Sequence, residues 1–135
     1  MKKLSLYLFL FGAISSSCKK IRVEQPVNTQ VEIRVINATA FILYNCTVDP
    51  FGTLSDNPGV NAYNYGQLNI DSTSIYKTFS KAYRYSWFRL TMNNKTYYLK
   101  PYDYTGESLL LNGRYTYKLT YSTITDRLNL ELFKD

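Results

Sequence analysis

The sequence predicts an all-β domain built as a two-sheet antiparallel β-sandwich, Ig-like or transthyretin-like, of about seven or eight strands. Short segments alternate apolar and polar residues with a period of two, as half-buried strands do. Turn-forming residues separate these segments at the spacing of a sandwich. The chain also holds fourteen tyrosines, a residue type that favours strands, and no segment after residue 18 has helical periodicity.

The first eighteen residues have the three parts of a secretory signal peptide. Lys2 and Lys3 form a basic start, residues 4–14 form an apolar core, and small residues follow. The apolar core is about half of the roughly 20 residues that a membrane-spanning helix needs. The alternative of a transmembrane helix is therefore disfavoured.

The end of this segment, Ser15-Ser16-Ser17-Cys18, resembles the lipobox of bacterial lipoproteins, although that family prefers leucine where this chain has Ser15. The resemblance implies removal of residues 1–17 as a signal peptide, a diacylglycerol on the Cys18 sulfur, and acylation of the new amino group. Two or more acyl chains give stable membrane attachment, because each buried methylene contributes about 0.8 kcal/mol. The predicted organisation is a lipoprotein signal peptide at 1–17, a flexible tether at 18–29 and a folded domain at 30–135.

The net charge of the chain bears on which partners the protein can bind. The formal charge is +6, and loss of Lys2 and Lys3 would leave +4, spread along the chain. This is too weak for a nucleic-acid-binding protein. The basic residues of the tether (Lys19, Lys20 and Arg22) either contact anionic headgroups or form a solvated leader.

The chain has no histidine, so the commonest general base and the commonest transition-metal ligand are both missing. A Ser-His-Asp or Cys-His catalytic set is excluded. Carboxylates and one cysteine make a poor zinc site, and we expect no metal and no cofactor. If Cys18 is lipidated, Cys46 has no disulfide partner, and we expect a buried, inert thiol rather than a reactive one.

The first predicted strand is 31–36, where Val31, Ile33 and Val35 alternate with polar residues. The second is 40–48, apolar at both parities and therefore central or covered on both sides. Residues 49–66 are rich in Pro, Gly, Asp and Asn and have no period. A connection this long is often functional, but it can also be a plain crossover between sheets with a short edge strand near 62–65.

Short strands are expected at 67–70 and 75–80, separated by a turn at 71–73. A long strand at 83–92 places Trp87 and Arg89 on one face and Phe88 and Leu90 on the other. Asn93-Asn94 predicts a tight turn into a strand at 95–100, so these two strands form a hairpin. After a loop at 101–106, residues 109–111 lead to strands at 114–122 and 127–133, the last with leucines inward and Phe133 outward.

The stretch from Leu109 to Tyr117 includes Asn112-Gly113-Arg114-Tyr115 and resembles the entry to a late strand in immunoglobulin-like, fibronectin-III-like and transthyretin-like sandwiches. The resemblance implies a tyrosine corner, with Tyr115 as its first candidate and Tyr117 as its second. It also implies that Trp87 packs between the sheets. The whole chain looks like a small Gram-negative envelope lipoprotein, which implies an envelope location and no particular activity. We expect the outer membrane, on the periplasmic side, because the residues after Cys18 are basic, unlike the acidic surface-export signal of some envelope lipoproteins.

Function is predicted only as a class. The scattered carboxylates and the small size of the domain argue against an enzyme. Exposed tyrosines stack on sugar rings or peptide faces, which favours a non-catalytic binding module for a glycan or a protein. The candidate ligand-binding residues are Tyr63, Tyr65, Tyr102 and Tyr104. The alternative is a structural spacer or an accessory subunit of an envelope assembly, in which the tyrosines serve the fold.

Overall fold

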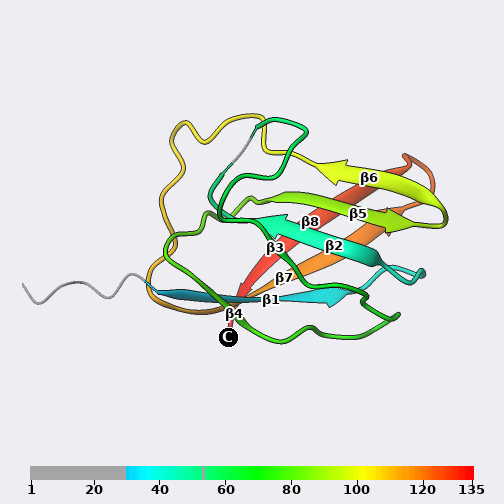
Figure 1. Ribbon diagram of the computed structural model, residues 1–135, viewed down its shortest axis with the longest axis horizontal. Coiled ribbons are helices and arrows are strands. Elements are labelled where there is room, and N and C mark those ends of the chain that lie inside the picture. Colours follow the sequence, from blue (N-terminus) through cyan, green and yellow to red (C-terminus); the bar gives the residue numbers. More distant parts are fainter. Residues whose placement is uncertain (1–29, 53) are drawn as a thin grey trace, which may run out of the picture.

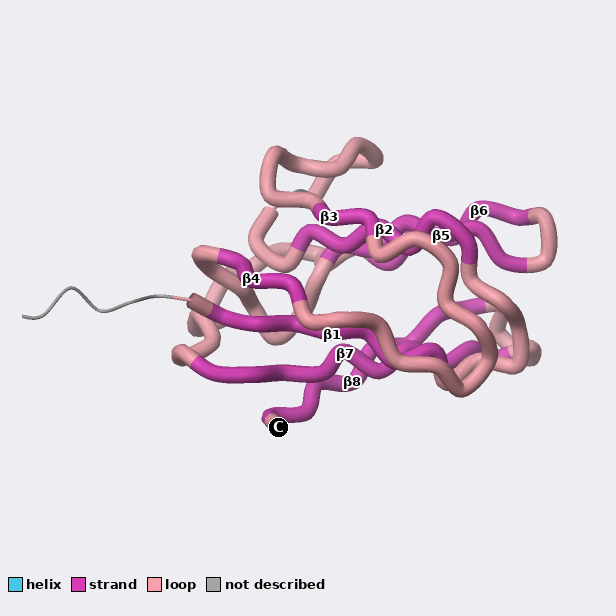
Figure 2. Tube along the Cα trace, turned by 60° about the horizontal axis from the view of Figure 1, so that its bottom comes forward, coloured by secondary structure: helices cyan, strands magenta, loops and turns pink. Residues whose placement is uncertain are grey.

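The computed structural model describes residues 30–52 and 54–135, and these residues form eight strands and no helix. Two four-stranded sheets lie face to face as two layers (Figures 1 and 2). The predicted signal peptide at 1–17, Cys18 and the tether at 18–29 lie outside the described residues. The strands are β1 (Val31–Asn37), β2 (Tyr44–Asp49), β3 (Tyr63–Asn64), β4 (Lys77–Phe79), β5 (Trp87–Met92), β6 (Lys95–Leu99), β7 (Gly113–Ser122) and β8 (Arg127–Lys134).

The predicted two-sheet sandwich is confirmed. The first sheet has the order β4-β1-β7-β8 and the second the order β3-β2-β5-β6. One pairing differs from the all-antiparallel expectation, because β1 and β7 run parallel along the whole of β1. Alternation of apolar and polar residues determines which face of a strand is buried but not the direction of its neighbour, so this parallel pair could not be predicted from it.

The strand order also separates the two sandwich types that the sequence suggested. In an immunoglobulin domain the first two strands belong to the same sheet. Here β1 and β2 belong to opposite sheets, and β1 lies between β4 and β7. The order therefore differs from that of an immunoglobulin domain.

The hydrophobic core lies between the two layers. From the first sheet it takes the alternate residues of β1 and β7, including Ile33 and Tyr117, and from the second sheet it takes Val48, Phe88 and Leu90. The rings of Phe88 and Tyr117 meet across the layers edge to face, with centroids 5.7 Å apart. Complete burial of one such side chain contributes about 1.5–3 kcal/mol, so these strands carry most of the stability.

Some elements begin later than predicted, and side-chain hydrogen bonds explain one case. The strand expected from residue 40 begins at Tyr44 because the fully buried Asn37 fixes a compact turn before it. The Asn37 amide nitrogen donates to the carbonyl oxygens of Phe41, Leu68 and Asn69 at 2.8–3.0 Å. Its amide oxygen accepts from the backbone and the hydroxyl of Thr39.

Two other predicted strands shrink in the structure. The segment 67–70 contributes only one bridge, between Leu43 and Leu68. The long strand expected at 83–92 is regular only from Trp87, and Tyr83 instead bridges to Leu109.

The β5–β6 hairpin forms where the sequence predicts it. Asn93 and Asn94 both have positive φ, 51° and 59°, as both central residues of a type I′ turn do. A polar cluster joins this hairpin to the β7–β8 hairpin: Lys95 pairs with Asp126, and the hydroxyls of Tyr97 and Tyr121 donate to the same carboxylate at 2.9 and 2.7 Å.

The loops after β2, β4 and β6 lie at the end of the sandwich where β1 begins (Figure 1). Backbone bonds hold them together, from Tyr83 N–H to the Pro50 carbonyl and from Leu110 N–H to the Ala82 carbonyl, each 2.8 Å. The last loop enters β7 through Gly113, whose φ of 149° favours glycine. The Tyr115 hydroxyl then donates to the carbonyl of Leu111, four residues upstream, at 2.9 Å, which is the bond of a tyrosine corner.

Candidate functional site

A row of polar side chains crosses the outer face of the second sheet. Backbone register places one residue of each strand side by side: Asn64 opposite Thr47, Thr47 opposite Arg89, and Arg89 opposite Tyr98. The neighbouring row, Val48, Phe88 and Leu99, has the opposite parity and points into the core. Because side chains alternate along a strand, the polar row must face away from the core.

Three of these residues, Asn64, Arg89 and Tyr98, line a groove of about 410 Å³, within the roughly 300–1,000 Å³ of small-molecule sites, whereas Thr47 is buried beneath it. Its lining is mostly neutral and polar, and contains no carboxylate. Tyr98 is 46% exposed at one side of the groove, and Lys100 Nζ lies over its ring, 5.3 Å from the ring centroid. The lining residues are Asn45, Asn64, Arg89, Leu90, Thr91, Thr96 and Tyr98.

A β-bulge shapes one wall of the groove. The register between β2 and β5 shifts between Tyr44 and Thr47, and Asn45 has a positive φ of 51°. The Thr47 hydroxyl donates to the Asn45 carbonyl at 3.1 Å and supports this local backbone. Bulges re-aim side chains and occur often beside binding sites. Here the bulge puts the Asn45 side chain at the groove.

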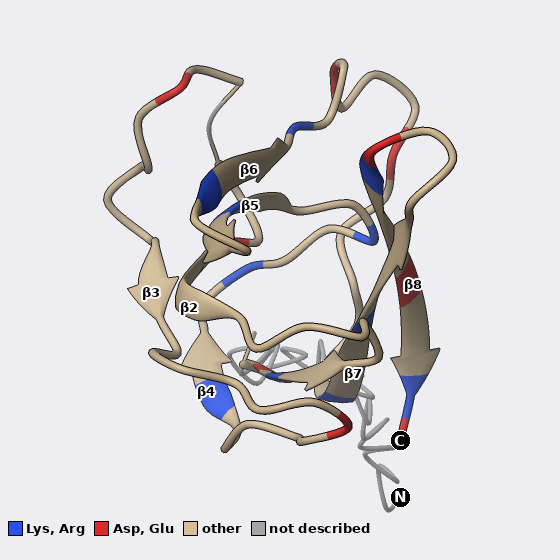
Figure 3. Cartoon of the chain, turned by 90° about the vertical axis from the view of Figure 1, so that its right-hand side faces the viewer, with Lys and Arg blue, Asp and Glu red and all other residues tan. Residues whose placement is uncertain are grey.

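Arg89 is the only charged residue of the groove lining. Its guanidinium lies over the Trp87 ring, 5.9 Å from the centroid. It has no hydrogen bond or ion pair with any residue in 30–52 or 54–135. Two arginines of the other sheet differ: Arg34 binds Thr116 and Asp135, and Arg114 pairs with Glu32 at 2.7 Å. Lysines and arginines are otherwise spread over both sheets rather than gathered on one (Figure 3).

Trp87 lies beneath Arg89 on this face of the sheet and does not belong to the core between the sheets. It is fully buried, but it shares the outward parity of Arg89, so the expectation that it packs between the sheets is wrong; Phe88 takes that place. Segment 54–57 covers it, and its indole N–H donates to the Ser55 carbonyl at 2.9 Å. An ion pair between Lys100 and Asp56 ties this segment to the end of β6.

The loop after β2 therefore covers Trp87. The expectation that it crosses between the sheets is wrong, because β2 and β3, which it joins, are neighbours in the second sheet. The fully buried Asp49 organises its start by accepting from the backbone N–H groups of Phe51 and Gly59, at 3.2 and 2.9 Å. A side chain at Gly52 would overlap the Asp49 carboxylate, because an ideal Cβ there would lie 2.2 Å from Oδ2. This part of the chain needs glycine for space.

The first predicted tyrosine pair, Tyr63 and Tyr65, is brought together but is half-buried. The rings meet edge to face, with centroids 4.9 Å apart, and both pack against the core. The Tyr65 hydroxyl donates to the Ile33 carbonyl of the other sheet at 2.7 Å. Burial raises the pKa of Tyr65 above its ordinary range. Only Tyr63 meets a cation, with Lys77 Nζ 4.7 Å from its ring centroid.

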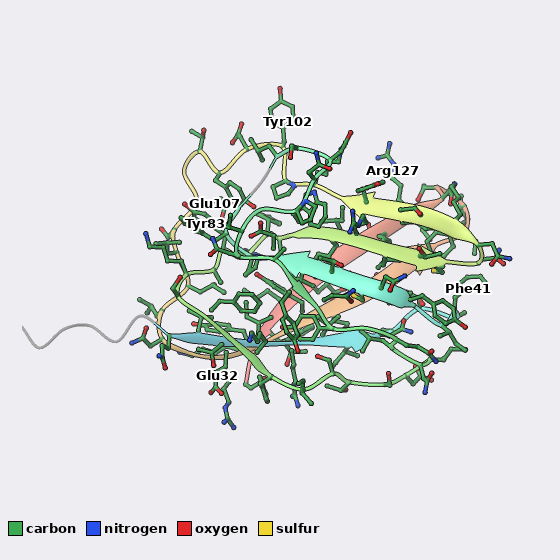
Figure 4. The ribbon with its side chains drawn as sticks, in the orientation of Figure 1. Glu32, Phe41, Tyr83, Tyr102, Glu107 and Arg127 are labelled. Carbon is green, nitrogen blue, oxygen red and sulfur yellow. The ribbon has the colours of Figure 1, made fainter. Side chains whose placement is uncertain are left out.

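The second predicted pair, Tyr102 and Tyr104, is not together. Tyr102 is 97% exposed and points away from the body of the domain (Figure 4). Tyr104 stacks on Tyr83 with centroids 4.3 Å apart, and Tyr83 stacks in turn on Phe51 at 5.6 Å. The buried Tyr104 hydroxyl has no hydrogen-bond partner among the described residues. No ring contact between described residues links this stack to Tyr63 and Tyr65.

The groove contains residues that sequence reasoning did not select as a site. Arg89 and Tyr98 carry only the general signal of a charged and an aromatic residue, and Asn45, Asn64 and Thr96 carry no signal of their own. Their proximity depends on the strand order β3-β2-β5-β6, which alternation cannot reveal.

The described residues contain no group of three His, Cys, Asp or Glu side chains arranged to hold a metal ion. Within the same residues no helix is long and apolar enough to cross a membrane.

Comparison with known proteins supports the fold and nothing finer. No protein-family model matches the sequence, and no curated protein matches it significantly. The structure is similar to an NMR structure of a protein from Eubacterium rectale, with a TM-score of 0.50 and 15% identity. The match covers 82% of this chain and 92% of that one. At this identity the likeness concerns the fold alone.

Proposed function

We propose that this protein is a non-catalytic binding module, an envelope lipoprotein held on the membrane through Cys18. The observation that carries the binding role is the polar groove on the outer sheet face, lined by Asn64, Arg89 and Tyr98 among others. Unpaired polar groups beside an exposed ring suit a hydrated ligand such as a glycan, which offers hydroxyls and an apolar ring face. The proposed location is the outer membrane of a Gram-negative bacterium, on the periplasmic side.

A glycan is favoured over a protein partner by the chemistry of the groove. Protein interfaces are built around buried apolar and aromatic anchors. Within the groove only Tyr98 exposes an apolar surface, since Leu90 is almost fully buried. The guanidinium of Arg89 and the hydroxyl and amide groups of Asn45, Asn64, Thr91 and Thr96 make up the rest.

The test is a glycan array probed with the tagged mature protein, alongside a pull-down from envelope extract. We expect retention on glycans and a loss of that retention in a Tyr98→Ala variant, with Tyr102→Ala as a matched control on an exposed ring outside the groove. Selective capture of one envelope protein, with no glycan retained, would contradict the glycan assignment. No retention in either assay would contradict the binding role.

The second candidate is a structural spacer or an accessory subunit of an envelope assembly. It is favoured by the fate of the tyrosines, because Tyr65, Tyr115 and Tyr117 are buried or half-buried and donate to backbone carbonyls. A spacer requires no groove. Substitutions throughout the groove should then leave envelope phenotypes unchanged, whereas shortening the tether should alter them.

The anchor has its own test. We expect a radioactive fatty acid to label the wild-type protein in cells and to leave Cys18→Ala unlabelled, because the acyl chains attach to the Cys18 sulfur and to the amino group freed by cleavage. Cys46→Ala is the matched control and should label normally. Equal labelling of Cys18→Ala would contradict the anchor.

A further inference from the structure

We propose that the ligand of the groove is an acidic polysaccharide, and that Arg89 binds the carboxylate of a uronic acid unit. This inference rests on the proposed glycan-binding function and names its substrate class. It is carried by the guanidinium of Arg89, which lies at the centre of the polar row and lacks an anionic partner among the described residues.

The missing partner is informative because Arg89 is only partly exposed. A guanidinium withdrawn from water is normally paired, as Arg34 is with Asp135 on the opposite sheet. The groove around Arg89 holds no Asp or Glu among its lining residues. The planar fork of N–H donors in arginine matches a carboxylate in a two-bond geometry, which a lysine cannot reproduce.

The neighbours of Arg89 suit the remainder of a sugar. The side-chain hydroxyls of Thr91 and Thr96 and the side-chain amide of Asn45 make no hydrogen bond with any described residue, although all three lie at the groove. They can donate to and accept from sugar hydroxyls. Asn64 uses its amide oxygen to accept from Gly66 N–H at 2.7 Å, which fixes the side chain with its amide N–H groups free to donate.

Tyr98 completes the arrangement. Arg89 and Tyr98 are cross-strand neighbours, so a sugar that stacks on the exposed Tyr98 ring places its substituents beside the guanidinium. The guanidinium of Arg89 lies over the Trp87 ring. The Trp87 and Tyr98 rings also pack edge to face, with centroids 6.4 Å apart. The cation is therefore positioned on the sheet and not at the end of a free side chain.

The experiment measures the affinity of the mature full chain for three uronic acid polymers: polygalacturonate, alginate and hyaluronan. For the polymer that binds best, a carboxyl-reduced form of the same chain is measured in parallel. We expect the reduced form to bind at least tenfold more weakly. We also expect Arg89→Gln to weaken binding of the acidic polymer at least tenfold and to leave binding of the reduced polymer unchanged. The affinity of Arg89→Lys for the acidic polymer should lie between those of the wild type and Arg89→Gln.

Two controls separate recognition from general charge attraction. Arg127→Gln removes the same charge from an exposed arginine of β8 and should leave every affinity unchanged (Figure 4). Dextran sulfate reports binding of any polyanion. If dextran sulfate binds as well as the uronic acid polymer and Arg127→Gln weakens it as much as Arg89→Gln does, the inference is overturned. Melting temperatures of all variants show whether each is folded.

The remaining outcomes distinguish this inference from the proposed function. If neutral glycans bind as well as acidic ones, or Arg89→Gln has no effect while Tyr98→Ala abolishes binding, the glycan-binding function stands and the acidic substrate class is wrong. If no glycan of either kind binds to the folded protein, both proposals fail.

Discussion

Single buried polar residues decide the local structure of this domain. Asn37 is fully buried at the end of β1, and its amide reaches three carbonyl oxygens and one hydroxyl. Asn37 thereby connects β1 to the segment around Leu68, far along the chain. Because unmade hydrogen bonds in the interior are costly, this residue contributes more to stability than its size suggests.

We predict that Asn37→Asp destabilises the domain by about 3 kcal/mol, since it removes the N–H donors and puts acceptor against acceptor. Urea unfolding followed by tyrosine and tryptophan fluorescence measures the change. Asn129→Asp, at an exposed position on β8, is the matched control and should change the unfolding free energy by less than about 0.5 kcal/mol. Equal effects of the two substitutions would show that the Asn37 network carries no special weight.

Cys46 gives a second prediction at this scale. Burial raises the pKa of its thiol to about 12, so the thiolate that reacts with disulfide reagents is scarce at neutral pH. In a Cys18→Ser chain, where Cys46 is the one remaining cysteine, we expect no reaction at pH 8 until denaturant is added. Rapid labelling of the folded chain would mean that the site opens readily.

At the scale of the strands, the two hairpins β5–β6 and β7–β8 hold each other at one end of the sandwich. The carboxylate of Asp126 pairs with Lys95 and accepts hydrogen bonds from the hydroxyls of Tyr121 and Tyr97. These three contacts lower the pKa of the carboxyl to about 2. The carboxylate form is therefore preferred in the folded state. Its contribution to stability is present above the ordinary carboxyl pKa and is lost as the pH falls through the folded value.

We predict that the unfolding free energy of the wild type falls between about pH 4 and pH 2 and that Asp126→Asn reduces the size of this fall. Glu131→Gln, an exposed carboxylate on β8, should leave the pH profile nearly unchanged. Denaturant titrations at pH 6, 4, 3 and 2 provide the comparison. An identical profile for Asp126→Asn would show that the cluster forms without stabilising the fold.

At the scale of the whole molecule, the parallel pairing of β1 with β7 joins the two halves of the first sheet, β4-β1 and β7-β8. These strands lie 82 residues apart in sequence, as the contact between Arg34 and Thr116 illustrates. Two strands so far apart in the sequence must pair before the core is complete. Folds dominated by such pairings fold in milliseconds to seconds. We predict refolding in that range by stopped-flow fluorescence, and a microsecond phase that restores the native signal would contradict it.

How much the sequence predicts differs between these scales. The faces of β1, β5 and β7 follow from alternation alone, and the Asn93-Asn94 turn and the Tyr115 corner follow from local chemistry. The groove could not be predicted in the same way. Asn64, Thr47, Arg89 and Tyr98 come from four strands, and only the strand order and the bulge at Asn45 make them neighbours.

The place where the chain enters the sandwich sets how the domain would stand if moored at Cys18. Twelve linking residues span at most about 43 Å when fully extended, so the end of the sandwich where β1 begins would lie within that distance of the bilayer. The groove lies on a sheet face and not at that end. A polymer could therefore reach the groove even while the loop-bearing end faces the membrane.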